Sequence, residues 1–234
     1  RHPGIVAAQE LIDRQAGGLG LDVPAGDVHQ AQIVHLKLFQ AVQLPDPAPE
    51  MLGQQRILAH ELHHTGFFYW LNHNLPDLKI APVMLAGILA AEGMASHFID
   101  CVPDHLAEYR RRQNTIYVQV AADWQNHTAN LPGLYKRSQS DLRDLLKGDL
   151  KPAEAQKWWM AGAKGPAYIL GAHMIAFIEK ELGRKAVFGV VRDFGTLLTT
   201  YNRAARRAEL RGEHPFVFST DLAERLADYT SDNS

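Results

Sequence analysis

The sequence predicts a mainly α-helical domain with a small β element near its N-terminus. Helix signals dominate the chain, while only one early segment, Ile33–Phe39, alternates apolar and polar residues as a strand does. With 234 residues and 46% hydrophobic content, the chain can bury a full core in one domain. We therefore expect a single domain spanning 1–234, with an edge strand in 1–47, two chemistry-bearing helices in 48–100 and a helical lobe in 101–234.

The N-terminal part is predicted to hold one helix and the strand. A possible helix over Gly4–Gln15 is followed by a turn at Gly17–Gly20, and then by the strand Ile33–Phe39. Lys37 lies on the outer, polar side of that strand, which is typical of a sheet edge. The strand could be an ordinary edge or could dock an extended peptide. Pro45–Pro49 then breaks the chain.

The rest of the chain is predicted to be helical, with breaks at proline, glycine and asparagine. A helix runs to about Asn72, and a loop over Asn72–Asp77 precedes an apolar helix within Ala81–Phe98. The remaining predicted elements, in order, are a helix over Asp104–His127, a turn at Asn130–Gly133, short helices to Leu150, a restart at Lys151-Pro152, a helix from Pro166 to a cap at Gly183, and further helices to Tyr229, with 230–234 frayed.

The segment Leu58-Ala-His-Glu-Leu-His-His-Thr65 contains the His-Glu-x-x-His pattern of zinc hydrolases. At about 100° per residue, His60 and His64 lie ~40° apart on a helix, with Glu61 ~60° beyond His64. One helix face therefore carries two zinc-ligand imidazoles and one carboxylate.

Apolar residues share that face and predict that it points toward a packed interior: Ile57, Phe67, Phe68 and Leu71. We accordingly expect the imidazoles and the Glu61 carboxylate to point inward. In the alternative, His60 or His64 is a hydrogen-bonded core histidine and Glu61 reaches solvent. His63 lies on the far side of His60 and is expected to be a surface or supporting histidine.

Glu92 is the one charged residue in the apolar segment Ala81–Phe98. None of its neighbours three or four positions away is basic, so another group must balance its charge. A metal ion would do so, because a catalytic zinc takes three protein ligands and keeps one position for water. Gly93 beside it would let this helix approach the His60 helix closely. The alternative is a protonated or locally paired glutamate in a packed helix.

His60-Glu-Leu-His-His64, followed 28 positions later by Glu92-Gly-Met-Ala95, resembles the gluzincin clan of metallopeptidases. The chain is also similar to bacterial families of zinc-dependent peptidases of unknown function, around Gly165–Gly171 and Tyr201-Asn202. The resemblance covers roughly Ile33 to Asn202. It implies a gluzincin-like zincin helical domain that binds one Zn²⁺ per chain through His60, His64 and Glu92. It also implies that 48–100 holds the zinc-binding helices.

The chain departs from the thermolysin version of this pattern at Ser96, which stands where an aspartate is expected four residues after the glutamate. The partner that orients a zinc-bound histidine is thus unassigned.

The mechanism that the resemblance implies also follows from the residue types. Zinc lowers the pKa of its bound water, and Glu61 can take the proton as general base. A second donor is usually needed for the oxyanion, and Tyr168 is the first candidate, on the same helix side as Gly171. His173 points ~140° away and ranks second. Alternatively, Tyr168 is an aromatic residue of the core with its hydroxyl bonded elsewhere.

Charge and composition exclude several classes of partner. The net charge is −2, with acidic and basic residues interspersed, so no general field favours nucleic acid or a membrane surface. The uncharged apolar run Ile80–Ala91 is too short to span a bilayer and contains Pro82, so we expect a soluble protein.

Cys101 is the only cysteine, which leaves the redox compartment open. The chain begins at Arg1 without a methionine, and this favours an exported (periplasmic or extracellular) protein over a cytoplasmic one.

The sequence therefore predicts a zinc-dependent peptidase that hydrolyses a peptide bond in a peptide or protein substrate. Two alternatives stay open: a catalytically inactive relative that binds zinc or a partner, and a helical interaction module with a buried polar network. The sequence does not fix the cleavage specificity, exo or endo action, or the oligomeric state.

Overall fold

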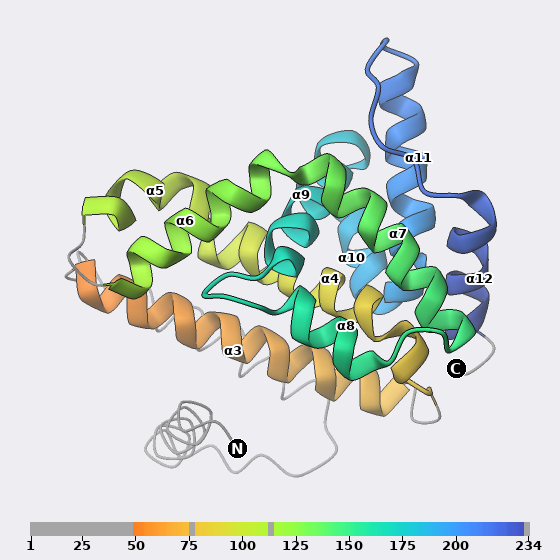
Figure 1. Cartoon of the computed structure of the whole chain (residues 1–234), viewed down its shortest axis with the longest axis horizontal. Helices are drawn as coiled ribbons and strands as arrows, with labels where there is room; N and C mark the ends of the chain where they lie inside the picture. The colour runs from red at the N-terminus through yellow and green to blue at the C-terminus, as the bar shows by residue number, and fades with distance from the viewer. Residues whose placement is uncertain (1–48, 75–77, 112–114, 232–234) are drawn as a thin grey trace. The chain divides into compact units, whose positions relative to one another are not determined.

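The computed structural model describes residues 49–74, 78–111 and 115–231, and nearly all of them lie in helices joined by short connections (Figure 1). Internal contacts divide the chain into two units, Arg1–Gly66 and Phe67–Ser234, and each is described by itself. The division falls inside α3 (Pro49–Asn74). Phe67 and Leu71 of its C-terminal part belong to the core of the second unit.

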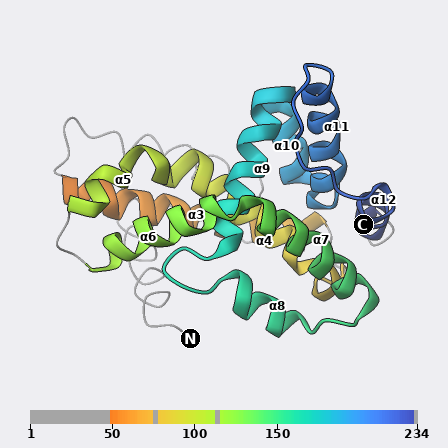
Figure 2. The ribbon, with the colours of Figure 1, turned by 45° about the horizontal axis from the view of Figure 1, so that its top comes forward.

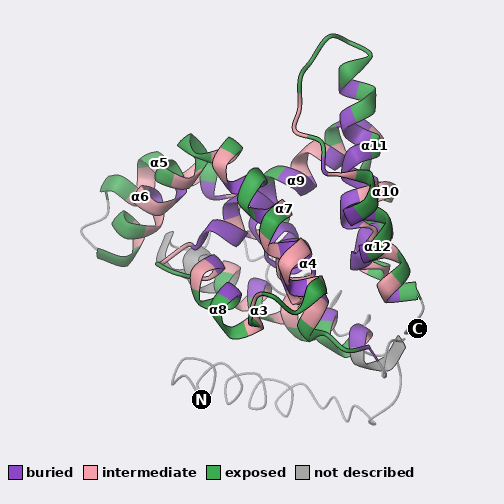
Figure 3. Ribbon diagram, turned by 45° about the vertical axis from the view of Figure 1, so that its right-hand side comes forward, coloured by how far each residue is buried: buried purple, intermediate pink, exposed green. Residues whose placement is uncertain are grey.

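The core of the second unit is built around α4 (Met84–Ala95), whose side chains are small and apolar apart from Glu92. Most of its residues are buried, as its colouring in Figure 3 shows. The short 3-10 helix η1 (Ala81–Val83) leads into α4, and the π-helix η2 (Ser96–Asp100) continues it. An amphipathic helix has a polar face that can meet water. Since α4 is apolar on nearly every side, it is suited to the core of this unit, where most of its residues are buried.

The helix α9 (Pro166–Leu182) packs closely against α4. Gly93 of α4 and Gly171 of α9 face each other, and a Cβ atom built on Gly93 would lie 2.5 Å from the carbonyl carbon of Gly171. Only two glycines permit backbones to approach this closely. The small residue that the sequence placed beside Glu92 thus serves the contact with α9.

The remaining helices surround this pair. Figure 2 shows α10 and α11 beside α9. Their bounds, in chain order, are α5 (Val102–Arg111), α6 (Thr115–Ala129), α7 (Leu131–Lys147), α8 (Pro152–Trp159), α10 (Arg184–Arg192), η3 (Phe194–Thr196), α11 (Leu197–Glu209) and α12 (Thr220–Ser231). A smaller apolar cluster, which includes Val102 and Trp124, lies apart from the main core.

The predicted fold class is wrong in its β element, because the described residues contain helices and no strand. The expected strand Ile33–Phe39 and the helix over Gly4–Gln15 lie outside the described residues. The described core is formed by apolar residues packed between helices, and no strand contributes to it. The described architecture is all-α.

Three predicted boundaries are also corrected. The single helix expected over 104–127 is divided into α5 and α6. The turn expected at Asn130–Gly133 is the start of α7, with Asn130 as its N-cap and a proline in the first turn. Thr230, expected to fray, is buried in α12, where its hydroxyl donates a hydrogen bond to Asp193 Oδ1 at 2.9 Å.

The run Ala81–Asp100, which comprises η1, α4 and η2, is long and apolar enough to cross a membrane by length and composition alone. It is also 61% buried among other parts of the protein, as a core helix would be. This run is longer than the uncharged segment Ile80–Ala91, because the helical structure continues past Glu92.

Candidate functional site

In α3, the two histidines of the His-Glu-x-x-His pattern face each other. The Nε2 atoms of His60 and His64 lie 2.9 Å apart, and the two rings meet edge to face. Without a metal, one ring nitrogen must donate and the other accept, whereas a metal ion would use both as acceptors. Two imidazole nitrogens that converge one turn apart on a helix are the donor set that zinc prefers.

The face of α3 differs from the prediction in which residues it buries. His60, Phe67 and Leu71 are buried and His64 is half-buried, which is a stripe at intervals of three and four residues. Glu61 is exposed, and Ile57 and Phe68 are 58% and 52% exposed. The expectation that the Glu61 carboxylate points into a packed interior is wrong. Glu61 is ~100° around the helix from His60, and this position lies beyond the edge of the buried stripe.

Glu92 is buried within α4, with 8% of its surface exposed. One turn later on the same helix, Ser96 is buried as well, and its Oγ has no hydrogen-bond partner within the described part of the chain. A buried hydroxyl without a partner is costly, and it is suited to orient a carboxylate or a bound water. The π-helix η2 begins at Ser96, and such irregular turns are frequent at functional sites.

Tyr168 lies in the first turn of α9, which begins at Pro166 as predicted and is capped by Gly183. The half-buried Tyr168 ring has the ammonium of Lys164 over its face, 4.2 Å from the ring centroid. Lys164 Nζ also donates to Asp100 Oδ2 at 2.5 Å. The lysine is thus held between an aromatic face and a carboxylate.

The loop that carries Lys164 is anchored from a second side. Asp123 Oδ2 on α6 accepts hydrogen bonds from the backbone N–H groups of Ala163 and Lys164, at 2.8 and 3.2 Å. Sequence reasoning missed Lys164, Asp100 and Asp123. Their separations along the chain are too long for any local pattern to reveal them.

His173, the second candidate for the oxyanion donor, belongs to a different cluster. Its Nδ1 lies 2.9 Å from the Tyr135 hydroxyl on α7. His173 is exposed, yet partial desolvation of its ring lowers its pKa below its ordinary 6.5, and burial raises the pKa of Tyr135 well above 10. The hydrogen bond therefore joins a neutral tyrosine to a neutral imidazole.

Asn202, one of the residues that carry the resemblance to zinc-dependent peptidases, has a structural contact on α11. Its amide nitrogen donates to the carbonyl of Phe218, and its Oδ1 accepts from the N–H of Phe218, each at 2.9 Å. The neighbouring Tyr201 is buried among aromatic rings. These contacts hold the segment before α12 against α11.

Comparison with known proteins gives one match. The model of a family described as "Putative zinc dependent peptidase (DUF5700)" matches residues 19–209, which is most of the chain. No curated protein and no solved structure matches it.

Proposed function

The chain belongs to the DUF5700 family, and from that premise we propose that it is a zinc-dependent peptidase whose metal ligands are His60, His64 and Glu92. The proposal includes one Zn²⁺ per chain and the gluzincin type of mechanism, with Glu61 as general base. Its substrate would be a peptide or protein.

One observation carries this proposal. The Nε2 atoms of His60 and His64 converge to 2.9 Å within α3, and Glu92, a buried carboxylate of the second unit, is the proposed third ligand. Two imidazoles and one carboxylate are a common ligand set of catalytic zinc, which leaves a fourth position for water or substrate. The buried Ser96 hydroxyl one turn after Glu92 has no hydrogen-bond partner among the described residues, and it would be available to a water bound at the metal.

When bound, zinc would polarise a substrate carbonyl and make water acidic enough to ionise near neutral pH. The exposure of Glu61 suits a base that must reach water and then pass the proton to the leaving amine. Its position next to His60 in the same helix keeps the carboxylate close to the first ligand.

Tyr168 would donate a hydrogen bond to the oxyanion that forms on the attacked carbonyl. Lys164 would hold the Tyr168 ring in place, because its ammonium lies over the ring and is itself hydrogen-bonded to Asp100. His173 is not used in this proposal, because its Nδ1 is already hydrogen-bonded to the Tyr135 hydroxyl.

A cleavage assay on a complex peptide mixture tests the proposal. Wild-type protein with added zinc should create new termini that incorporate oxygen from labelled water. Glu61→Gln should keep its zinc and lose turnover by about 10²- to 10⁴-fold, because only the base is removed. A wild-type protein that holds zinc and cleaves no peptide in the mixture would instead be a zinc-binding protein without this activity.

A further inference from the structure

An open hollow of about 580 Å³ lies between the end of α9, α10 and α11, and none of the proposed zinc-site residues lines it. Figure 2 shows α10 and α11 side by side. One wall includes Lys185, Ala186 and Gly189, and the other includes Thr199, Thr200 and Arg203. Each wall follows a helical spacing of three and four residues, so the two stripes face each other.

The hollow exists because two positions on the α10 wall carry little or no side chain. Ala186 contributes a methyl group and Gly189 contributes none. A Cβ atom built on Gly189 would meet nothing within 4 Å. Since close packing normally fills the space between neighbouring helices, this open volume is available to a small molecule.

The charged residues that line the hollow are both basic. Lys185 and Arg203 are exposed, and neither forms an ion pair within the described part of the chain. Among the residues that the structure describes, no carboxylate lines the space. Two cations with no opposing charge create a positive potential that favours an anion.

Thr200 supplies a hydrogen-bond donor from the floor. The hydroxyls of Thr196 and Thr199 donate to the backbone carbonyls of Asp193 and Thr196, at 2.7 and 3.0 Å. Thr200 is only 9% exposed, yet its hydroxyl makes no hydrogen bond to any described residue. A hydroxyl that lines a hollow and makes no hydrogen bond to the protein is available to bind a ligand oxygen.

We infer that this hollow binds a small organic anion through a phosphate or carboxylate group. The guanidinium of Arg203 offers a planar pair of donors to two anion oxygens, Lys185 adds a point charge, and Thr200 donates from below. The apolar part of the ligand would lie over Ala186. This site is independent of the proposed peptidase function.

Calorimetric titration with inorganic phosphate, phenyl phosphate and benzoate tests the inference. The titrations use the His64→Ala variant with a chelator, so that no anion can bind at a metal. We expect saturable binding that weakens at least tenfold in Arg203→Gln. Tighter binding of phenyl phosphate than of benzoate would assign the site to phosphates, and the reverse would assign it to carboxylates. Absence of saturable binding by all three probes would overturn the inference.

Two further variants separate a built site from diffuse charge. Gly189→Leu should abolish binding by filling the hollow, and it should fold well because leucine is a better helix former than glycine. Arg206→Gln removes the same charge from an exposed position of α11 that does not line the hollow, and it should bind as the parent does. Equal weakening by Arg203→Gln and Arg206→Gln, or unchanged binding in Gly189→Leu, contradicts the site.

Discussion

Gly93 of α4 and Gly171 of α9 meet backbone to backbone, and this contact sets how closely the two helices pack. Glu92 directly precedes Gly93, and Tyr168 lies one turn before Gly171. The proposed ligand and the proposed oxyanion donor therefore both lie beside this close helix crossing in the core. Both proposed functional side chains therefore come from helices, which hold side chains in position more precisely than loops do.

The helix crossing predicts a sharp contrast between two glycines of α4. Gly93→Ala should lower the free energy of unfolding by about 1–3 kcal/mol, because its methyl group would collide with the backbone of α9. Gly87→Ala should be neutral or stabilising by up to about 1 kcal/mol, since its new Cβ would make ordinary contacts of 3.7 Å with Phe194. Urea unfolding of both variants checks this. Equal effects would mean that the crossing is looser than described.

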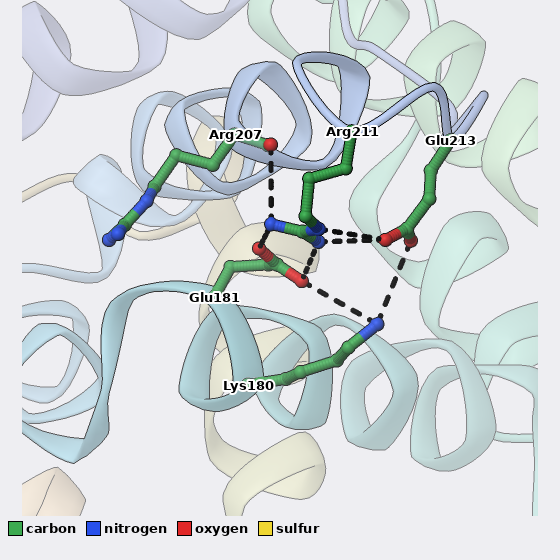
Figure 4. Close-up of polar contacts among 5 residues, drawn as sticks. All are labelled: Lys180, Glu181, Arg207, Arg211 and Glu213. Atoms are coloured by element: carbon green, nitrogen blue, oxygen red, sulfur yellow. Dashed lines mark hydrogen bonds and ion pairs between the residues drawn. The ribbon is translucent and has the colours of Figure 1, made fainter.

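A network of ions ties the end of α11 to α9 and predicts a loss of stability in acid. Arg211 donates to both oxygens of Glu181, at 2.7 and 2.8 Å, and also pairs with Glu213 (Figure 4). Lys180 bridges the same two carboxylates. Hydrogen bonds from the Arg211 guanidinium lower the pKa of Glu181 below its ordinary 4.5.

Because the folded pKa of Glu181 is the lower one, its contribution to stability is complete above pH 4.5 and is lost as the pH falls through the folded value. Melting temperatures measured between pH 3 and pH 7 should therefore fall less steeply in Glu181→Gln than in the parent. Glu154→Gln, at an exposed position of α8, serves as the matched control and should follow the parent. A Glu181→Gln curve parallel to that of the parent would exclude this contribution.

His173 should titrate below its ordinary pKa of 6.5, because partial desolvation disfavours the charged ring even though the residue is exposed. The unfolded state then binds the proton more readily, so stability should fall as the pH drops below 6.5 toward the folded pKa. Nuclear magnetic resonance of the imidazole protons gives the value directly. Tyr135→Phe removes the hydroxyl that is hydrogen-bonded to His173 and should lower the free energy of unfolding by about 0.5–1.5 kcal/mol. A His173 pKa at or above 6.5 would contradict this environment.

Tyr168→Phe tests the role proposed for the hydroxyl. Turnover on a cleaved peptide should fall by about 10²- to 10³-fold, with little change in KM, since the hydrogen bond would form mainly in the transition state. The fold should be unchanged, because the ring and its contact with Lys164 remain. Full activity in Tyr168→Phe would mean that the Tyr168 hydroxyl is not the oxyanion donor.

Local signals allowed much of the helical structure to be predicted from the sequence. Pro166 and Gly183 mark both ends of α9, because proline fits the first helical turn and the backbone of Gly183, at φ 82°, is one that glycine readily adopts. Asn130-Leu-Pro-Gly133 misled because the same residues that form turns also start helices. A turn and a helix start share these residues, and they differ only in whether the next residues continue the helix.

The polar cluster around Tyr168 could not be predicted in the same way. Lys164 and Asp100 are 64 residues apart, and Asp123 bonds a backbone group 41 residues away. Tertiary packing alone brings them together. Gly93 was predicted to let its helix approach the His60 helix, whereas the structure packs it against Gly171 of α9, since periodicity shows which face is small and not what covers it. The exposure of Glu61 was missed for a related reason, because angular spacing gives a direction and not the width of the buried stripe.

The zinc content of protein purified without chelator decides whether His64 and Glu92 bind a metal. His64→Ala and Glu92→Gln are compared with the parent, and His63→Ala is the control within the same motif; circular dichroism verifies that all four proteins fold. The account predicts about one zinc per chain in the parent and in His63→Ala, and loss of zinc in the other two. A folded parent that takes up no zinc, or a Glu92→Gln variant that retains it fully, would contradict the proposed ligand set.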